Sequence, residues 1–450
     1  MNFKDISDLD KATRKKSGDV LRLGLAMVFV VGIMFYTMSV GSPSPMLIAS
    51  AVIGAYMAMN IGANDVANNV GPAVGSRALT MFGALAIAAI FEAGGALIAG
   101  GEVVGTIRSG IIDPSGIPDT DTFVWLMMAA LLAGALWLNV ATFVGAPVST
   151  THSIVGAVLG AGVAASGMDI ANWGKMGTIA ASWVISPVLG GLIAAAFLYL
   201  IKRSITYQQD MTAAAGRMVP ILIALMVWTF SAYLMLKGLN QIWKVSFASA
   251  VSYSAVLAVL AYLVTRPLIL RRVNVLENNK QSVNHFFTLP LIFAAALLSF
   301  AHGSNDVANA IGPLSAVAAT VNNAGQIVAK SHIDWWVLPL GAVGIVLGLA
   351  AMGKRVMATV GTGITHLTPS RGFAAQLATA STVVIASGTG LPISTTQTLV
   401  GAIMGVGLAR GIAAINLGVV RNIVISWVIT LPAGALLAIV IFWALQGIFL

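Results

Sequence analysis

Long apolar runs alternate with short polar segments along the whole chain. Runs of about 20 residues, the length that crosses a bilayer as a helix, recur throughout, and one of them covers residues 21–40. No segment between the runs is long enough for a water-soluble domain of useful size. The pattern therefore predicts an all-α polytopic membrane protein, with the lipid bilayer as its surroundings.

Three polar motifs interrupt the apolar runs, and each occurs twice in the same order. "GANDVANNVGP" at 62–72 returns as "GSNDVANAIGP" at 303–313, "PVSTTHSIVG" at 147–156 returns as "PISTTQTLVG" at 392–401, and the "SWVI" at 182 returns at 426. The separation within each pair is nearly constant, which indicates two copies of one unit. We place repeat 1 at 46–201, repeat 2 at 290–450 and linking helices with basic loops at 202–289.

Each repeat is expected to cross the membrane five times, so that the two copies face opposite ways. Two crossings near 219–237 and 247–265 separate them, and residues 1–45 add a basic tail and one more helix. About 12 to 13 transmembrane helices result. Lysine and arginine gather in short loops, which are expected on the cytoplasmic side. Inverted repeats with polar motifs at matching positions are typical of secondary transporters with a midplane site.

Composition agrees with this interpretation and narrows the function. Hydrophobic residues make up 58% of the chain and charged residues 9%, against roughly a quarter charged in soluble domains. The net charge is +9, and the basic residues gather in short loops beside the apolar runs. Because this is the pattern of cytoplasmic loops in a membrane protein, we expect no nucleic acid partner. There is no cysteine, which excludes disulfides and thiolate metal sites.

The two NDVAN motifs place buried carboxylates beside amides. An aspartate at mid-membrane costs about 2.5–3.5 kcal/mol on insertion scales, so Asp65 and Asp306 are expected to hold a ligand. Oxygen donors suit small cations, and a carboxylate could also carry a proton. Helix–helix hydrogen bonding would explain the amides but not the aspartates. The glycines and Pro72 and Pro313 that follow predict a broken helix at each motif, lining a cavity. The predicted cation ligands are Asn64, Asp65, Asn68, Asn305, Asp306 and Asn309, with sodium as the metal at Asp65 and Asp306.

Each Ser-Thr-Thr triplet follows a proline and is expected to open a helix. Ser and Thr favour the N-cap and proline the first turn, and a helix N-terminus attracts anions. Ordinary capping would need only one hydroxyl. The motifs contain no lysine or arginine, so hydroxyls and helix ends would bind a tetrahedral oxyanion. The predicted oxyanion ligands are Ser149, Thr150, Thr151, Ser394, Thr395 and Thr396.

With these motifs in view, the chain resembles the inorganic phosphate transporter (PiT) family, across both repeats. The resemblance implies a central site for phosphate and its coupling cations at the four motifs. Their form is similar to the sodium-phosphate branch, and implies secondary active import of phosphate by symport with sodium. Proton-coupled transport of phosphate or metal-phosphate, and sulfate transport, are the alternatives within the family.

The second repeat departs from the family in titratable groups. Gln397 stands where histidine is common and Gln376 where glutamate is common, while the first half has His152 and Glu92. These four residues are the candidates for a coupling role, and the two glutamines favour sodium over protons.

Other classes of function fit the chain less well. An enzyme would need a nucleophile and a base, and Ser149 with His152 is the one candidate pair, which the second repeat does not keep. A receptor or channel gives no reason for two buried aspartates. We expect a multi-pass protein of the cytoplasmic (inner) membrane with no cofactor, with sodium as a co-transported ligand, and with a homodimer as the assembly considered.

Overall fold

A computed structural model describes residues 24, 27–40, 44–100, 110–238, 244–322, 327, 333–389 and 394–449. Repeat 1 contains α2 (Pro45–Asn64), α3 (Val66–Gly75), α4 (Met81–Ala99), α6 (Thr120–Val144), α7 (Thr150–Ser166) and α8 (Trp173–Ile201). The linking helices are α9 (Met211–Tyr233) and α10 (Phe247–Val273). Repeat 2 contains α11 (Lys280–Asp306), α12 (Ala308–Asn322), α13 (Val337–Met352), α14 (Lys354–Ala358), α15 (Pro369–Thr389), α16 (Thr395–Leu408) and α17 (Leu417–Phe449).

The described residues form an all-helical membrane protein, as predicted. Eight helices are long and apolar enough to cross a membrane, and a ninth is counted if the bent pair Val337–Met352 and Lys354–Gly363 forms one span. The predicted basic tail lies mostly outside the described residues. Each predicted crossing contains a helix, but not every one is of full length. The helix Met27–Val40, α7 and α16 are shorter than 18 residues, and the count of 12 to 13 treated them as complete crossings.

The reason for the short α7 and α16 is where they begin. Ser149 and Ser394 cap these helices and are both buried, so each helix starts inside the protein instead of at a membrane surface. The prediction that the triplets open helices is confirmed, although Pro392 lies outside the described residues.

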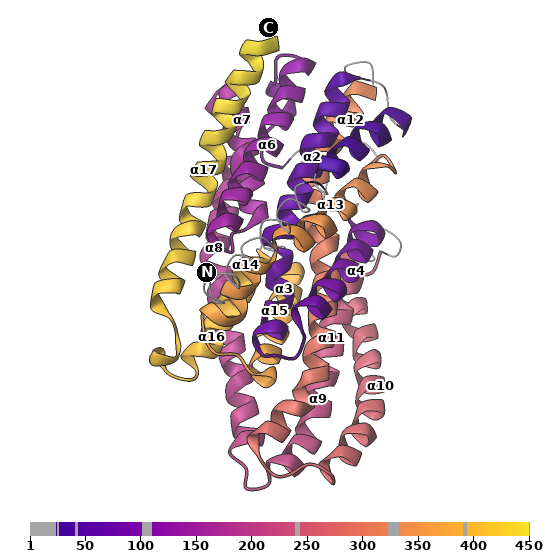
Figure 1. Ribbon diagram of the computed structural model, residues 1–450, viewed down its shortest axis with the longest axis vertical. Coiled ribbons are helices and arrows are strands. Elements are labelled where there is room, and N and C mark those ends of the chain that lie inside the picture. The colour runs from indigo at the N-terminus through magenta and orange to yellow at the C-terminus, as the bar shows by residue number, and fades with distance from the viewer. Residues whose placement is uncertain are drawn as a thin grey trace, which may run out of the picture.

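The two repeats run in opposite directions. In Figure 1, α2 and α3 descend whereas α11 and α12 rise, and α8 descends whereas α17 rises to the C-terminus at the top. The ends of α8 and α10 lie together at the lower end. Arg203 follows α8 in a short helical segment, and Arg271 and Arg272 lie in the last turn of α10. One basic end and one less basic end agree with the positive-inside pattern.

The repeats interlock by exchanging helix partners. α4 packs along α11 and α2 along α13, while α7 packs along α17 and α16 along α8. Every one of these pairs joins a helix of one repeat to a helix of the other, and the pairs are reciprocal. Neither repeat could bury its polar motifs alone, so the central site belongs to both.

Apolar side chains cover the outside, as a lipid-facing surface requires. On α17, Val428, Leu436 and Val440 are exposed. In the most apolar 18-residue stretch of α10, only 11% of the residues are buried. The buried polar residues gather instead at the helix breaks in the interior.

The helix breaks lie at the aspartates and not at the prolines. One residue, Asp65, separates α2 from α3, and Val307 separates α11 from α12. The broken helix predicted at each motif is therefore present. Its position is corrected, because Pro72 and Pro313 lie inside α3 and α12, several residues after the breaks. After each break the chain makes a tight turn, in which Asn68 N bonds to Asp65 O (2.9 Å) and Ala310 N to Val307 O (3.0 Å).

Candidate functional site

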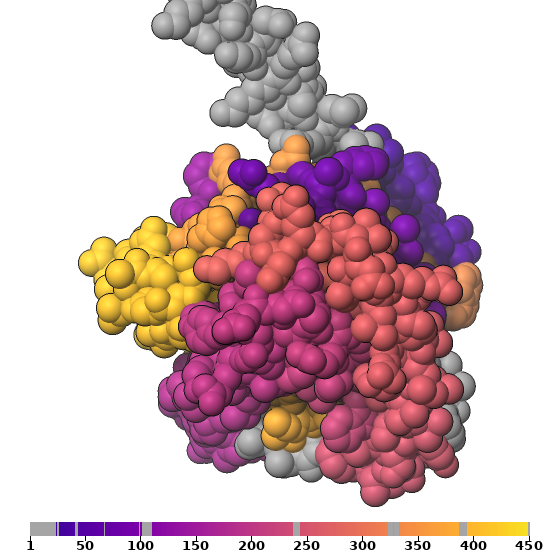
Figure 2. Space-filling view, turned by 90° about the horizontal axis from the view of Figure 1, so that it is seen from below, coloured from indigo at the N-terminus to yellow at the C-terminus, as the bar shows by residue number. Residues whose placement is uncertain are grey.

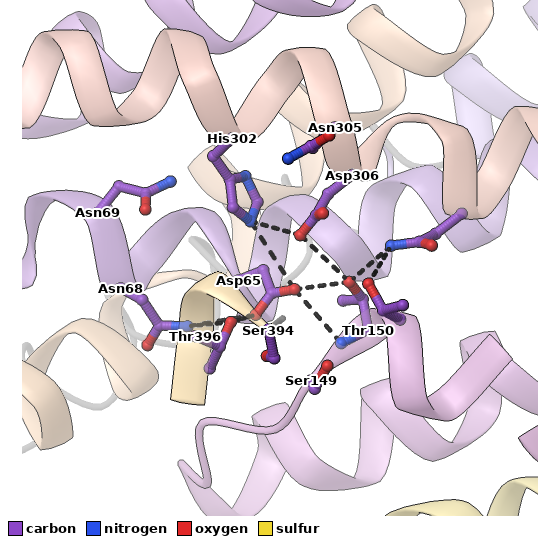
Figure 3. A network of polar contacts seen from close by, with 12 residues as sticks. Asp65, Asn68, Asn69, Ser149, Thr150, His302, Asn305, Asp306, Ser394 and Thr396 are labelled. Atoms are coloured by element: carbon purple, nitrogen blue, oxygen red, sulfur yellow. Dashed lines mark hydrogen bonds and ion pairs between the residues drawn. The ribbon is translucent and has the colours of Figure 1, made fainter. Parts of the chain in front are cut away.

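The Asp65 carboxylate lies at the meeting point of the two repeats. Its Oδ2 accepts a hydrogen bond from Thr150 Oγ1 (2.6 Å) and a longer one from Thr150 N (3.3 Å). Its Oδ1 accepts from Thr396 Oγ1 and from Asn68 Nδ2 (3.3 Å). Figure 3 shows the carboxylate between the start of α7 and the start of α16. One buried side chain thus binds both Ser-Thr-Thr segments.

Asp306 approaches the same hydroxyl from the other repeat. Its Oδ2 lies 3.5 Å from Thr150 Oγ1 and 2.7 Å from His302 Nε2. Asp306 is 7% exposed and Asp65 is 1% exposed. The structure therefore brings together the two aspartates that the repeated motif singled out.

His302 joins three carboxylates and was missed by the sequence analysis. Its Nε2 lies 2.7 Å from Asp306 and 3.8 Å from Asp65, while its Nδ1 lies 3.1 Å from Glu92 Oε2. It precedes Asp306 by four residues on α11, which puts both side chains on one helix face. That spacing was visible in "HGSNDVAN" and could have identified His302.

The hydroxyl triplets cap their helices in the same way. Ser149 Oγ accepts from His152 N and Ser394 Oγ accepts from Gln397 N, each at 3.3 Å. The two threonines after each serine therefore lie in a first helical turn, where backbone N–H groups are free to meet an anion. At α7 this place is taken by the Asp65 carboxylate.

Two asparagines form matching contacts across the repeats. Asn68 Nδ2 donates to Thr396 Oγ1 (3.4 Å), and Asn309 Nδ2 donates to Thr151 Oγ1 (3.2 Å) and to Thr150 Oγ1 (3.0 Å). Thr151 and Thr396 occupy the same place in their motifs. Each NDVAN motif therefore reaches the triplet of the opposite repeat.

The first asparagines of the motifs bond to the framework. Asn64 Nδ2 donates to Thr142 Oγ1 and Ala146 O, and Asn64 Oδ1 accepts from Val148 N. These bonds hold the segment that leads into α7. Asn305 Nδ2 donates to Tyr233 OH at 2.9 Å. Both side chains position the neighbouring aspartates, and their role as cation ligands stays a prediction.

The candidate coupling residues occupy different places. Glu92 is fully buried and accepts from Asn69 Nδ2 (2.7 Å) as well as facing His302. Gln376 Nε2 donates to Asn69 O at 2.7 Å, so Gln376 and Glu92 are linked through one residue. His152 is buried with its ring centroid 5.0 Å from that of Trp183. Gln397 is buried, and its Oε1 has no hydrogen-bond partner among the described residues.

Three carboxyl groups gather in this cluster around one imidazole. Asp65, Asp306 and Glu92 supply three carboxyl groups, and His302 is their only ion-pair partner in the described part of the chain. One ligand atom from each of Asp65, His302 and Asp306 lies within 4.8 Å of the others. Such a group attracts a cation or a proton, while the hydroxyls and the α7 N-terminus beside it suit an oxyanion.

Comparison with known proteins identifies the family. Residues 61–438 match the Phosphate transporter family. Relatives named "Putative phosphate permease" include one from Helicobacter pylori, 49% identical over 91% of this chain and 78% of its own length. Another, from Haemophilus influenzae, is 47% identical over 89% of this chain and 96% of its own length.

A solved structure, "The sodium-dependent phosphate transporter", is similar with a TM-score of 0.82 and 37% identity. It covers 90% of this chain, and the chain covers all of it. The match includes both repeats and all four polar motifs described above. With its two buried aspartates and paired hydroxyl triplets, the chain therefore belongs to the phosphate transporter (PiT) family and is a multi-pass phosphate permease, not an enzyme.

Proposed function

We propose that the protein imports inorganic phosphate across the cytoplasmic membrane by symport with sodium ions, with alternating access around the central site. The observation that carries the proposal is the sharing of Thr150 Oγ1 between Asp65 and Asp306. A hydroxyl suited to an oxyanion thereby lies against two groups suited to a cation. Neighbouring sites of opposite charge are what coupled binding requires. The sodium-dependent transporter of similar fold supports the choice of cation.

The hydrogen bonds of Asp65 suggest how the coupling works. Asp65 accepts from Thr150 Oγ1, Thr150 N and Thr396 Oγ1, which are the donors that a phosphate at the α7 N-terminus would use. A sodium ion coordinated by Asp65 and Asp306 would cancel their repulsion of phosphate. It would also draw the Asp65 oxygens toward itself and release the hydroxyls. Each ligand then favours the other, by an amount that is typically about 1–3 kcal/mol.

The remaining ligands of the central site would be Asn68, Asn309, Thr151, Thr395 and Thr396. Asn68 and Asn309 already bond across the repeats to the triplets. Movement of one repeat relative to the other would therefore change both halves of the site together. This is the geometry that alternating access between inverted repeats needs.

Proton coupling is the second candidate, and one observation favours it. The chain Glu92, His302 and Asp306 links a carboxylate, an imidazole and a second carboxylate at 3.1 and 2.7 Å. Such a chain can carry a proton between groups. Gln376 and Gln397, which cannot titrate, argue for sodium in the second repeat.

The test is uptake of labelled phosphate into proteoliposomes that contain the purified protein. An inward sodium gradient is imposed first, then a proton gradient without sodium, and sulfate is added as a competitor in each. We expect sodium-driven uptake that sulfate does not inhibit. Uptake driven only by protons would replace the sodium proposal by the proton one. Uptake of sulfate in place of phosphate would show that phosphate is not the substrate.

A further inference from the structure

Three cationic side chains meet at the basic end of the molecule, away from the central site. Lys202 directly follows α8, Arg371 lies in the first turn of α15 and Arg410 follows α16. Figure 2 views the protein from this end, where α8 to α11, in magenta and salmon, cover much of the surface beside α17 in yellow. All three residues are half-buried.

Hydrogen bonds to one short segment bring the three together. Arg410 Nη1 donates to Thr365 Oγ1 and to His366 O, each at 3.0 Å. Arg371 Nη1 donates to the same His366 O at 3.2 Å. Lys202 Nζ donates to Ala409 O, next to Arg410, at 2.9 Å. The two guanidinium groups thus share one carbonyl oxygen.

The cluster has no balancing negative charge. The charges of Arg371 and Arg410 act repulsively on Lys202, and that of Arg410 acts on Arg371. Within the residues that the structure describes, no carboxylate forms an ion pair with any of them. Holding three like charges together costs free energy that an anion would recover.

A pocket lies beside the cluster. It has a volume of about 340 Å³ and is lined by Gly75, by residues 361 to 367 and by residues 413 to 416. The three cationic side chains are not part of this lining, but Thr365 and His366, which accept hydrogen bonds from the arginines, are. Each arginine uses a single nitrogen in the bonds given above, so most of its planar array of donors remains for a ligand. That array matches the oxygens of a phosphate group.

We propose that Lys202, Arg371 and Arg410 form a second anion site, which binds a phosphate group at the basic end of the protein. The ligand is a phosphate group, and two kinds of molecule supply one at this end of the protein. It is either free inorganic phosphate that has passed through the central site or the headgroup of an anionic phospholipid, which is abundant in cytoplasmic leaflets. The site does not depend on which cation drives transport.

The experiment uses proteoliposomes and compares the wild type with one double variant, which carries both Arg371→Gln and Arg410→Gln. Arg203→Gln is the matched control, because Arg203 is exposed and next to Lys202 in sequence. In the first arm, liposomes of neutral phosphatidylcholine are loaded with unlabelled phosphate at increasing concentration. The measured quantity is how strongly this internal phosphate inhibits uptake of labelled phosphate from outside. In the second arm, phosphatidylglycerol is added to otherwise identical, unloaded liposomes.

If free phosphate is the ligand, the double variant needs about tenfold more internal phosphate for half-inhibition in neutral lipid, with the external KM unchanged. If lipid is the ligand, phosphatidylglycerol alters uptake and thermal unfolding of the wild type, and the double variant loses that response. Arg203→Gln behaves as wild type in both cases. A double variant that matches Arg203→Gln in both arms overturns the proposal.

The variant could also fail to insert, since Arg410 holds Thr365 and His366. The charge-preserving pair Arg371→Lys with Arg410→Lys covers this case. It keeps the positive charge and loses the planar donors, so the proposal requires part of the wild-type response to remain. A lysine pair with no response in either arm, in protein that still transports phosphate, overturns the proposal as well.

Discussion

Among single residues, Asp65 connects the most parts of the central site. It accepts hydrogen bonds from α7, α16 and its own α3, and it faces His302 of α11. Asp306 contacts Thr150 and His302 and lies beside Asp65. Two aspartates in equivalent motifs therefore have unequal surroundings.

Asp65→Asn should abolish gradient-driven uptake and leave the protein inserted, because the amide keeps the shape but not the charge that attracts sodium. Asp306→Asn should also stop coupled uptake, since it removes the second carboxylate at Thr150. Labelled phosphate uptake with a sodium gradient measures both. Normal sodium-dependent uptake in either variant would remove that aspartate from the cation site.

Thr150→Val should weaken phosphate affinity about ten- to hundredfold, because hydrogen bonds to charged groups are worth about 1.5–3 kcal/mol. Thr395→Val in the opposite triplet should weaken affinity less, because the described residues show no side-chain hydrogen bond for Thr395. Titration of phosphate binding by calorimetry gives both affinities. Wild-type phosphate affinity in both variants would reduce the triplets to helix caps.

His302→Gln should lower thermal stability and stop uptake. The imidazole is the one basic group that the described residues place against Glu92, Asp65 and Asp306, and removing one partner of a buried ion pair costs about 3–5 kcal/mol. His285→Gln on the same helix is exposed and should behave as wild type. A His302 variant with wild-type melting temperature and uptake would mean that the three carboxyl groups do not need the imidazole.

At the level of helices, close crossings hold the aspartates and His302 in register. α11 lies against α4 at Gly303, where an added Cβ would overlap the backbone carbonyl of Glu92. Only glycine allows this approach, and it sets the distance between His302 and Glu92. The short α7 and α16 also belong to this level, because their buried first turns supply the hydroxyls.

Gly303→Ala should force α11 away from α4, with a cost of about 1–3 kcal/mol for overpacking, and should reduce uptake by separating His302 from Glu92. Gly177→Ala in α8 provides the control, because a Cβ there meets nothing within 4 Å. Thermal unfolding and uptake are measured on both proteins. A Gly303 variant as stable and active as the Gly177 variant would show that the crossing tolerates a shift.

The sequence predicted the groups of the site better than their geometry. Asp65, Asp306 and Thr150 were found because polar residues repeated in apolar sequence are costly. The side chains of Asn64 and Asn305 bond to Thr142 and Tyr233 and not to the two aspartates. This depends on how the helices are rotated about their axes, which residue types alone do not reveal. The breaks fall at Asp65 and Val307, whereas the local signals in the sequence were Pro72 and Pro313.

For the whole molecule, the inverted repeats bring both NDVAN motifs and both hydroxyl triplets to one place, as the proposed joint site for cation and anion requires. Each triplet meets the NDVAN motif of the opposite repeat through Asn68 with Thr396 and Asn309 with Thr151. The helices exchange partners in the same reciprocal way. Sequence repetition predicted the opposite orientation, but the crossing of the motifs between repeats required the structure.

The most direct test of the account measures phosphate affinity by calorimetry with sodium and with potassium at equal ionic strength, in the wild type and in Asp65→Asn. If sodium frees Thr150 and Thr396 by neutralising Asp65, the wild type should bind phosphate about 5- to 150-fold more tightly in sodium. Asp65→Asn should bind phosphate with much less dependence on sodium. An undiminished sodium effect in Asp65→Asn, or equal affinity in the two salts for the wild type, would contradict the proposed coupling.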